Sequence, residues 1–168
     1  MRNSITAVLV AAAFGISGAA TAATTTTSFS VTATVLKTCS ATASTLAFGN
    51  YTPGAGAISG STTVNVKCTN GTSFTVALDK GTTTGGSITQ RLMANGANTL
   101  QYNLYKDAAF TTLFGDGTTG STSAGTGSGV ATAVSVTVYG QLPDNATNQN
   151  AVPSGTNYSD SITATITY

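Results

Sequence analysis

Apolar and hydroxyl side chains alternate along several short stretches of this sequence, and this two-residue period constrains the fold more than any other feature. The clearest stretch is 160–168, where Ile162, Ala164, Ile166 and Tyr168 alternate with Ser161, Thr163, Thr165 and Thr167. Successive side chains of a β-strand point to opposite faces of a sheet. The pattern therefore predicts a C-terminal strand with one buried and one solvated face.

Similar period-two runs recur upstream, at 29–35, 64–68, 74–78, 100–104 and 134–138. Clusters of Gly, Pro and Asn separate them, as expected for turns. Short strands joined by turns, with no sustained helical period, predict an antiparallel β-sandwich without helices. A closed β-barrel is the alternative. The glycine-rich segment 115–129 is expected to be a mobile surface loop.

Residues 1–22 have the pattern of a secretory signal peptide. A basic start precedes an apolar stretch of small residues, and Ala20-Thr21-Ala22 fits the small-x-small cleavage rule. The apolar run is shorter than the roughly 20 residues that a bilayer core needs. We expect cleavage at this site and no membrane span in the mature chain.

The composition argues against an enzyme. The 168 residues include no His, and all 5 acidic residues are Asp. General acid–base catalysis near neutral pH usually uses His or a perturbed carboxylate, and zinc sites use His and Cys. We therefore predict no catalytic, metal-binding or cofactor-binding residues. The net charge of +1 also gives no basic surface for nucleic acid.

Cys39 and Cys68 are the only cysteines. An even pair in an exported chain is most simply one structural disulfide. A redox pair is the weaker alternative, because the two residues are far apart in the sequence and form no Cys-x-x-Cys motif.

Several motifs, taken in order, resemble the spore coat protein U domain family. The C-terminal part carries Val138-Tyr139-Gly140-Gln141-Leu142-Pro143, then the segment 153–160, then the alternating end. The upstream motifs are Leu46-Ala47-Phe48-Gly49, the run 64–68, Arg91-Leu92 and the run 100–107. This domain is shared with the subunits of archaic, Csu-type chaperone–usher pili, and the chain is similar to a major shaft subunit of that class.

The resemblance implies an immunoglobulin-like antiparallel β-sandwich, at 39–168, that lacks its final strand. A neighbouring subunit would supply that strand from its N-terminal extension, here residues 23–38. The inserting side chains would be Phe29, Val31, Ala33 and Val35. Alternation alone does not distinguish this role from that of an ordinary first strand that pairs within its own domain. Periodicity by itself favours the internal strand, and the resemblance reverses that preference.

The resemblance also implies partners and a location. The partners would be identical or homologous pilin subunits, an outer-membrane usher, and a periplasmic chaperone that pairs with the C-terminal strand at Ile162, Ala164, Ile166 and Tyr168. The expected function is that of a structural subunit of a cell-surface pilus that supports adhesion and biofilm formation. The alternative is a secreted surface- or carbohydrate-binding module of the spore-coat kind.

Overall fold

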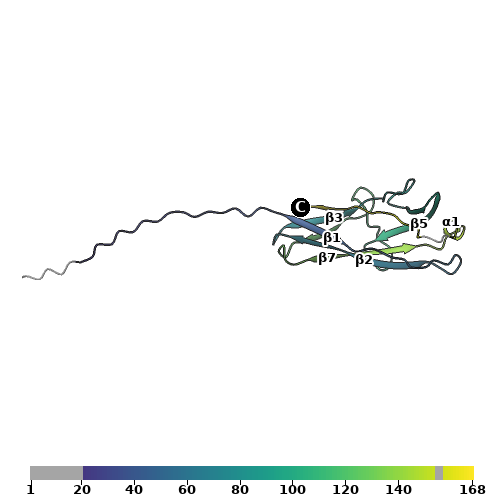
Figure 1. Cartoon of the computed structure of the whole chain (residues 1–168), viewed down its shortest axis with the longest axis horizontal. Helices are drawn as coiled ribbons and strands as arrows, with labels where there is room; N and C mark the ends of the chain where they lie inside the picture. Colours follow the sequence, from purple (N-terminus) through teal and green to yellow (C-terminus); the bar gives the residue numbers. More distant parts are fainter. Residues whose placement is uncertain (1–20, 154–156) are drawn as a thin grey trace, which may run out of the picture. The chain divides into compact units, whose positions relative to one another are not determined.

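The computed structural model of the chain describes residues 21–153 and 157–168. It divides the chain after Thr34, and the second unit, Val35–Tyr168, contains all the strands of the described part. Most of the predicted signal peptide, residues 1–20, lies outside the described residues. The elements are β1 (Cys39–Ala43), β2 (Ile58–Cys68), β3 (Ser73–Leu78), β4 (Arg91–Asn95), β5 (Asn98–Tyr105), β6 (Ser123–Thr126), β7 (Val134–Leu142), α1 (Ala146–Gln149) and β8 (Ala164–Thr167) (Figure 1).

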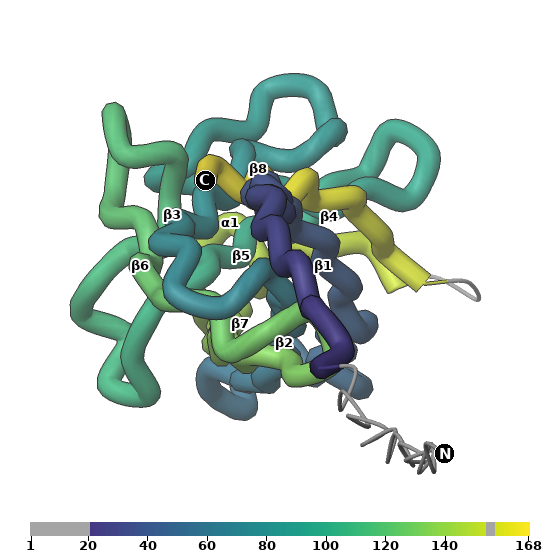
Figure 2. Tube along the Cα trace, turned by 90° about the vertical axis from the view of Figure 1, so that its left-hand side faces the viewer, coloured from purple at the N-terminus to yellow at the C-terminus, as the bar shows by residue number. Residues whose placement is uncertain are grey.

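The strands form two antiparallel sheets, as the period-two pattern predicts. One sheet has five strands in the order β1-β2-β7-β5-β4, and the other has three in the order β6-β3-β8 (Figure 2). The longest strand, β2, pairs with β7 from Ile58↔Leu142 to Val66↔Val134. On its other side, β2 pairs with the whole of β1. This pairing makes β1 one edge of the larger sheet, whereas β8 is one edge of the smaller sheet.

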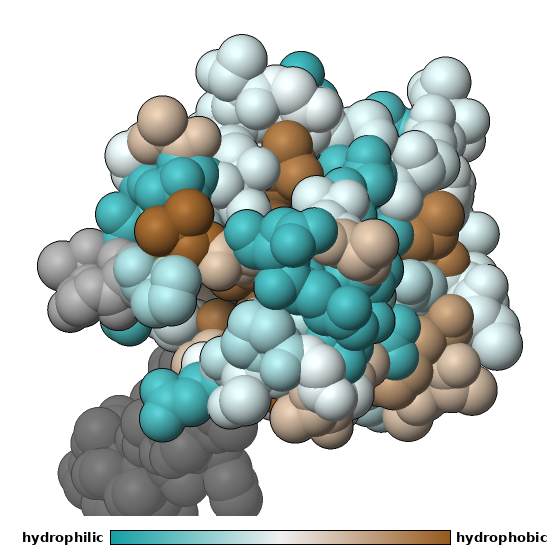
Figure 3. Space-filling view, turned by 90° about the vertical axis from the view of Figure 1, so that its right-hand side faces the viewer, coloured by the Kyte–Doolittle hydropathy of each residue, from teal (hydrophilic) through white to brown (hydrophobic). Residues whose placement is uncertain are grey.

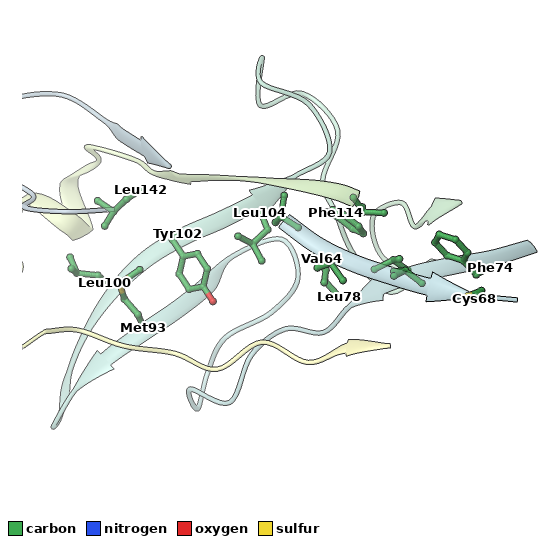
Figure 4. Packing of buried hydrophobic residues seen from close by; sticks show 14 residues of the cluster. Val64, Cys68, Phe74, Leu78, Met93, Leu100, Tyr102, Leu104, Phe114 and Leu142 are labelled. Atoms are coloured by element: carbon green, nitrogen blue, oxygen red, sulfur yellow. The ribbon is translucent and has the colours of Figure 1, made fainter. Parts of the chain in front are cut away.

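The inward-facing residues of the strands form the core. In β3, Phe74, Val76 and Leu78 are buried while Ser73 and Thr75 are exposed, as alternation requires. The same alternation buries the inner faces of β2, β5 and β7 (Figure 4). The buried apolar cluster comprises Val64, Val66, Cys68, Phe74, Val76, Leu78, Met93, Leu100, Tyr102, Leu104, Phe114, Val136, Val138 and Leu142.

The structure corrects the prediction of a mobile loop at 115–129. This segment contains β6, which pairs with β3 through contacts such as Phe74↔Gly125. A Cβ atom on Gly125 would collide with the Phe74 ring, so a glycine is needed for this close approach. The glycine-rich composition therefore reflects tight packing here.

One short helix also departs from the prediction. α1 follows β7 and is capped by the Asn145 side chain, which accepts a hydrogen bond from the Asn148 N–H at 2.9 Å. Asn148 is buried, and its amide group binds the main chain of Gln101 on β5 and Pro143. No helix in the described part of the chain is long and apolar enough to cross a membrane.

Candidate functional site

An open groove of about 890 Å³ runs over the core of the sandwich. Its floor consists of apolar side chains from strands of both sheets, namely Val64, Leu78, Met93, Leu100, Tyr102, Leu104, Val138 and Leu142. Two segments that are far apart in the sequence flank this floor: residues 43–51 form the first wall, and residues 157–164 form the second wall. Figure 3 views the end of the domain near α1 and shows apolar surface in recesses between hydrophilic side chains.

The first wall is attached to the domain by packing and by one carboxylate. Phe48 packs on the core and meets the Tyr102 ring edge-on, with the ring centroids 6.0 Å apart. The Tyr51 hydroxyl donates to Asp144 Oδ1 at 2.5 Å, and the Gly54 N–H donates to the same oxygen at 3.1 Å. Burial and then the hydrogen bond to Asp144 raise the pKa of Tyr51 to about 12. Tyr51 therefore stays a neutral donor at physiological pH.

The second wall connects the two sheets. Ser159 exchanges two backbone hydrogen bonds with Ala94 of β4, at 2.8 and 3.0 Å. Farther along, Ala164 begins β8 and pairs with Leu78 of β3. Ile162 lies between these points, half-buried against the core. The wall is thus tied to the larger sheet at its start and to the smaller sheet at its end.

Two edge strands each contribute one end residue to the groove lining. Ala43, at the end of β1, and Ala164, at the start of β8, both line it. Within residues 21–153 and 157–168, β1 pairs only with β2, and β8 pairs only with β3. The outer edges of both strands are therefore unpaired in this part of the chain, and the backbone N–H and C=O groups of an unpaired edge can pair with a further strand.

The predicted donor residues belong to no strand of the described chain. Residues 21–38 form neither a helix nor a strand. Phe29, Val31 and Val35 are 85%, 83% and 86% exposed, and Ala33 is exposed too. Large apolar side chains such as those of Phe29, Val31 and Val35 are usually buried, so their joint exposure is unusual.

The remaining predicted residues lie in the sandwich. Cys39 and Cys68 form the disulfide, which confirms the pairing and joins the first residue of β1 to the last residue of β2. The C-terminal side chains Ile162, Ala164 and Ile166 pack against the core, and the first two also line the groove. Tyr168 remains 55% exposed.

Some residues of the site were not singled out from the sequence. The Tyr102 hydroxyl donates to Asp160 Oδ2 at 2.7 Å, and in Figure 4 it points toward the C-terminal segment. Burial and then this hydrogen bond raise the pKa of Tyr102 far above its ordinary value. Asp144 and Asp160 occur in turn-like sequences, so no local pattern distinguishes them from surface residues.

The site offers nothing that resembles a metal centre. Across the described residues, no three His, Cys, Asp or Glu side chains come together in a way that could hold a metal ion. The side chains of the groove floor are mainly apolar, which suits them to covering other apolar side chains.

Fold and groove together define an antiparallel β-sandwich with an open apolar side. Residues 25–165 match the Spore Coat Protein U domain. This chain belongs to the spore coat protein U domain family. No curated protein matches the chain significantly.

A solved structure shares the fold. It is the CsuC–CsuE chaperone–tip adhesion subunit pre-assembly complex from archaic chaperone–usher Csu pili of Acinetobacter baumannii. The match has a TM-score of 0.52 and 21% sequence identity, and it covers 80% of this chain. The chain spans 40% of the matched chain.

Proposed function

We propose that this chain is a structural subunit of an archaic chaperone–usher pilus that polymerises by donor-strand exchange. The observation that carries the proposal is a groove with an apolar floor that is lined by the last residue of β1 and the first residue of β8, two strands with an unpaired outer edge in the described part of the chain. An inserted strand would cover the floor and pair with both edges. It would thereby remove the two costs of an incomplete sandwich, which are apolar core surface exposed to water and backbone groups without hydrogen-bond partners. Family membership and the likeness to the Csu complex support the same role.

We assign the inserted strand to residues 26–36 of a second copy of the chain. Phe29, Val31, Ala33 and Val35 are spaced two residues apart, so they would all point toward the floor of the groove. Burying Phe29, Val31 and Val35 contributes about 1.5–3 kcal/mol each. Together with a completed backbone ladder, this burial gives a very slowly dissociating link between subunits.

The same exposed surface makes the free subunit prone to aggregation. We therefore propose that a periplasmic chaperone pairs with the C-terminal strand, contacting Ile162, Ala164, Ile166 and Tyr168, until an outer-membrane usher assembles the filament. The finished filament lies on the cell surface and supports adhesion and biofilm formation.

A deletion tests whether the groove needs an added strand. The mature chain without residues 24–36 should be open and unstable, and a synthetic peptide of residues 26–36 should bind and stabilise it. A fully stable monomer that ignores the peptide would contradict the proposal.

A matched pair of substitutions tests the inserted face. Val31→Asp places a charge against the apolar floor and should abolish filament assembly, whereas Thr32→Asp places the same charge on the opposite face and should largely spare it. Filament length by electron microscopy is the readout. Equal effects of the two changes would refute the assigned face.

A further inference from the structure

The C-terminal segment passes from one sheet to the other at Asp160. Ser159 is bound to Ala94 of β4 in the larger sheet, and Thr163 is bound to Asp79, which follows β3 of the smaller sheet. Asp79 holds Thr163 twice, because its N–H donates to the Thr163 carbonyl at 3.1 Å and its Oδ1 accepts the Thr163 N–H at 2.9 Å. Asp160 therefore occupies the corner of the second wall of the groove.

The Asp160 carboxylate collects donors from two different elements. Its Oδ1 accepts the N–H and hydroxyl groups of Thr82 and Thr83, at 3.0–3.1 Å. Its Oδ2 accepts the Tyr102 hydroxyl from the groove floor. Gly81 has a φ of +86°, and a Cβ atom there would collide with this carboxylate. The loop after β3 is thus shaped around the Asp160 side chain.

A buried cation lies close to this corner. Arg91 is 0% exposed, and its guanidinium donates to the main-chain carbonyls of Asp79, at 2.7 and 2.9 Å, and of Phe114, at 2.9 Å. Burial lowers the pKa of Arg91, and the charges of Asp79 and Asp160 oppose that shift. The Asp160 carboxylate thus stabilises the buried charge of Arg91, and Arg91 in turn binds the main chain of Asp79 at the start of the loop that holds Asp160.

We infer that Asp160 is a positioning residue that keeps the groove open for an incoming strand, an inference that rests on the proposed function. An empty apolar groove tends to close, because moving a wall inward removes apolar surface from water. Closure of the second wall would pull the Asp160 carboxylate away from its donors and into an apolar cavity, which is strongly unfavourable. The open groove is therefore the favoured state before a strand arrives.

The matched test compares Asp160→Asn with Asp107→Asn. Asp107 also accepts several hydrogen bonds, from Ala109, Thr111 and Thr112, but it does not line the groove. Both changes are made in the full mature chain that carries Val31→Asp, so that its own extension does not compete. The probe is a fluorescent synthetic peptide of residues 26–36.

We expect Asp160→Asn to lower the association rate of the peptide by about tenfold or more, since only the open fraction of molecules accepts it. Asp107→Asn should leave the rate within about twofold of the parent, as a change remote from the groove does. Hydrogen exchange at the Ser159 and Thr163 amides should accelerate only in the Asp160 variant. A loss of thermal stability with unchanged peptide association would mean a merely structural role and would overturn the inference.

Tyr102→Phe provides a milder second test if the Asp160 variant does not fold. It removes one donor to Asp160 and keeps the ring, so the association rate should fall by a few-fold. A rate equal to that of the parent would overturn the inference in that case. If the parent itself binds no peptide, both the proposed function and the inference that depends on it are refuted, whereas equal binding by all variants refutes the inference alone.

Discussion

Replacing both cysteines with alanine should strongly destabilise the domain. Cys39 and Cys68 are separated by 29 positions, and a cross-link over a loop of this length stabilises a fold by about 3.5 kcal/mol in the chain-entropy model. Cys68 is also 0% exposed, so the loss of its sulfur leaves a gap in the core. We expect the free energy of unfolding to fall by about 3–5 kcal/mol.

Urea titration of the full mature chain measures this loss. The sequence has no Trp and 6 Tyr residues, so tyrosine fluorescence and far-UV circular dichroism are the suitable probes. The urea midpoint should fall and the m-value should rise, because the unlinked unfolded chain exposes more surface. Reduction of the wild-type disulfide serves as the control and should give a similar loss. An unchanged midpoint in both samples would refute the reasoning.

Three further changes probe separate parts of the fold. Gly127→Ala brings a Cβ atom within 2.6 Å of the Thr69 carbonyl oxygen, and urea titration should show a loss of about 1–3 kcal/mol. Arg91→Met leaves several buried carbonyls without their donor and should lower the free energy of unfolding by at least about 3 kcal/mol, so a neutral effect would contradict the described network. Hydrogen bonds to the Asp107 carboxylate lower its pKa to about 2, and the main-chain N–H of Thr111 makes the largest contribution. The destabilisation by Asp107→Asn should therefore be full above about pH 4 and should vanish as the pH falls to about 2, which melting temperatures at a series of pH values would check.

The strands that the sequence predicts best are those with apolar residues at every inward position. β3 and β7 alternate without interruption, so their existence and buried faces follow from the period alone. β4 escapes this pattern because its inward residues include Arg91, and a charged residue normally indicates a solvated face. The main-chain carbonyl groups that accept hydrogen bonds from Arg91, and so make the burial of Arg91 possible, come together only in the folded domain.

The groove is harder to predict than the strands. Its first wall, residues 43–51, has no regular secondary structure beyond Ala43 and hence no periodic signal. Asp144 and Asp160 fix the walls through contacts with residues more than 50 positions away, and sequence spacing carries no information about such contacts. The alternation in the N-terminal extension can be recognised in the sequence. Alternation does not show, however, whether this segment pairs within its own domain or with another subunit.

Electron cryo-microscopy of the assembled filament tests the central claim most directly. We predict that residues 26–36 of one subunit form a strand between β1 and β8 of the next, with Phe29, Val31, Ala33 and Val35 facing the groove floor. A filament in which this segment pairs within its own domain, or in which the groove stays empty, would contradict the account.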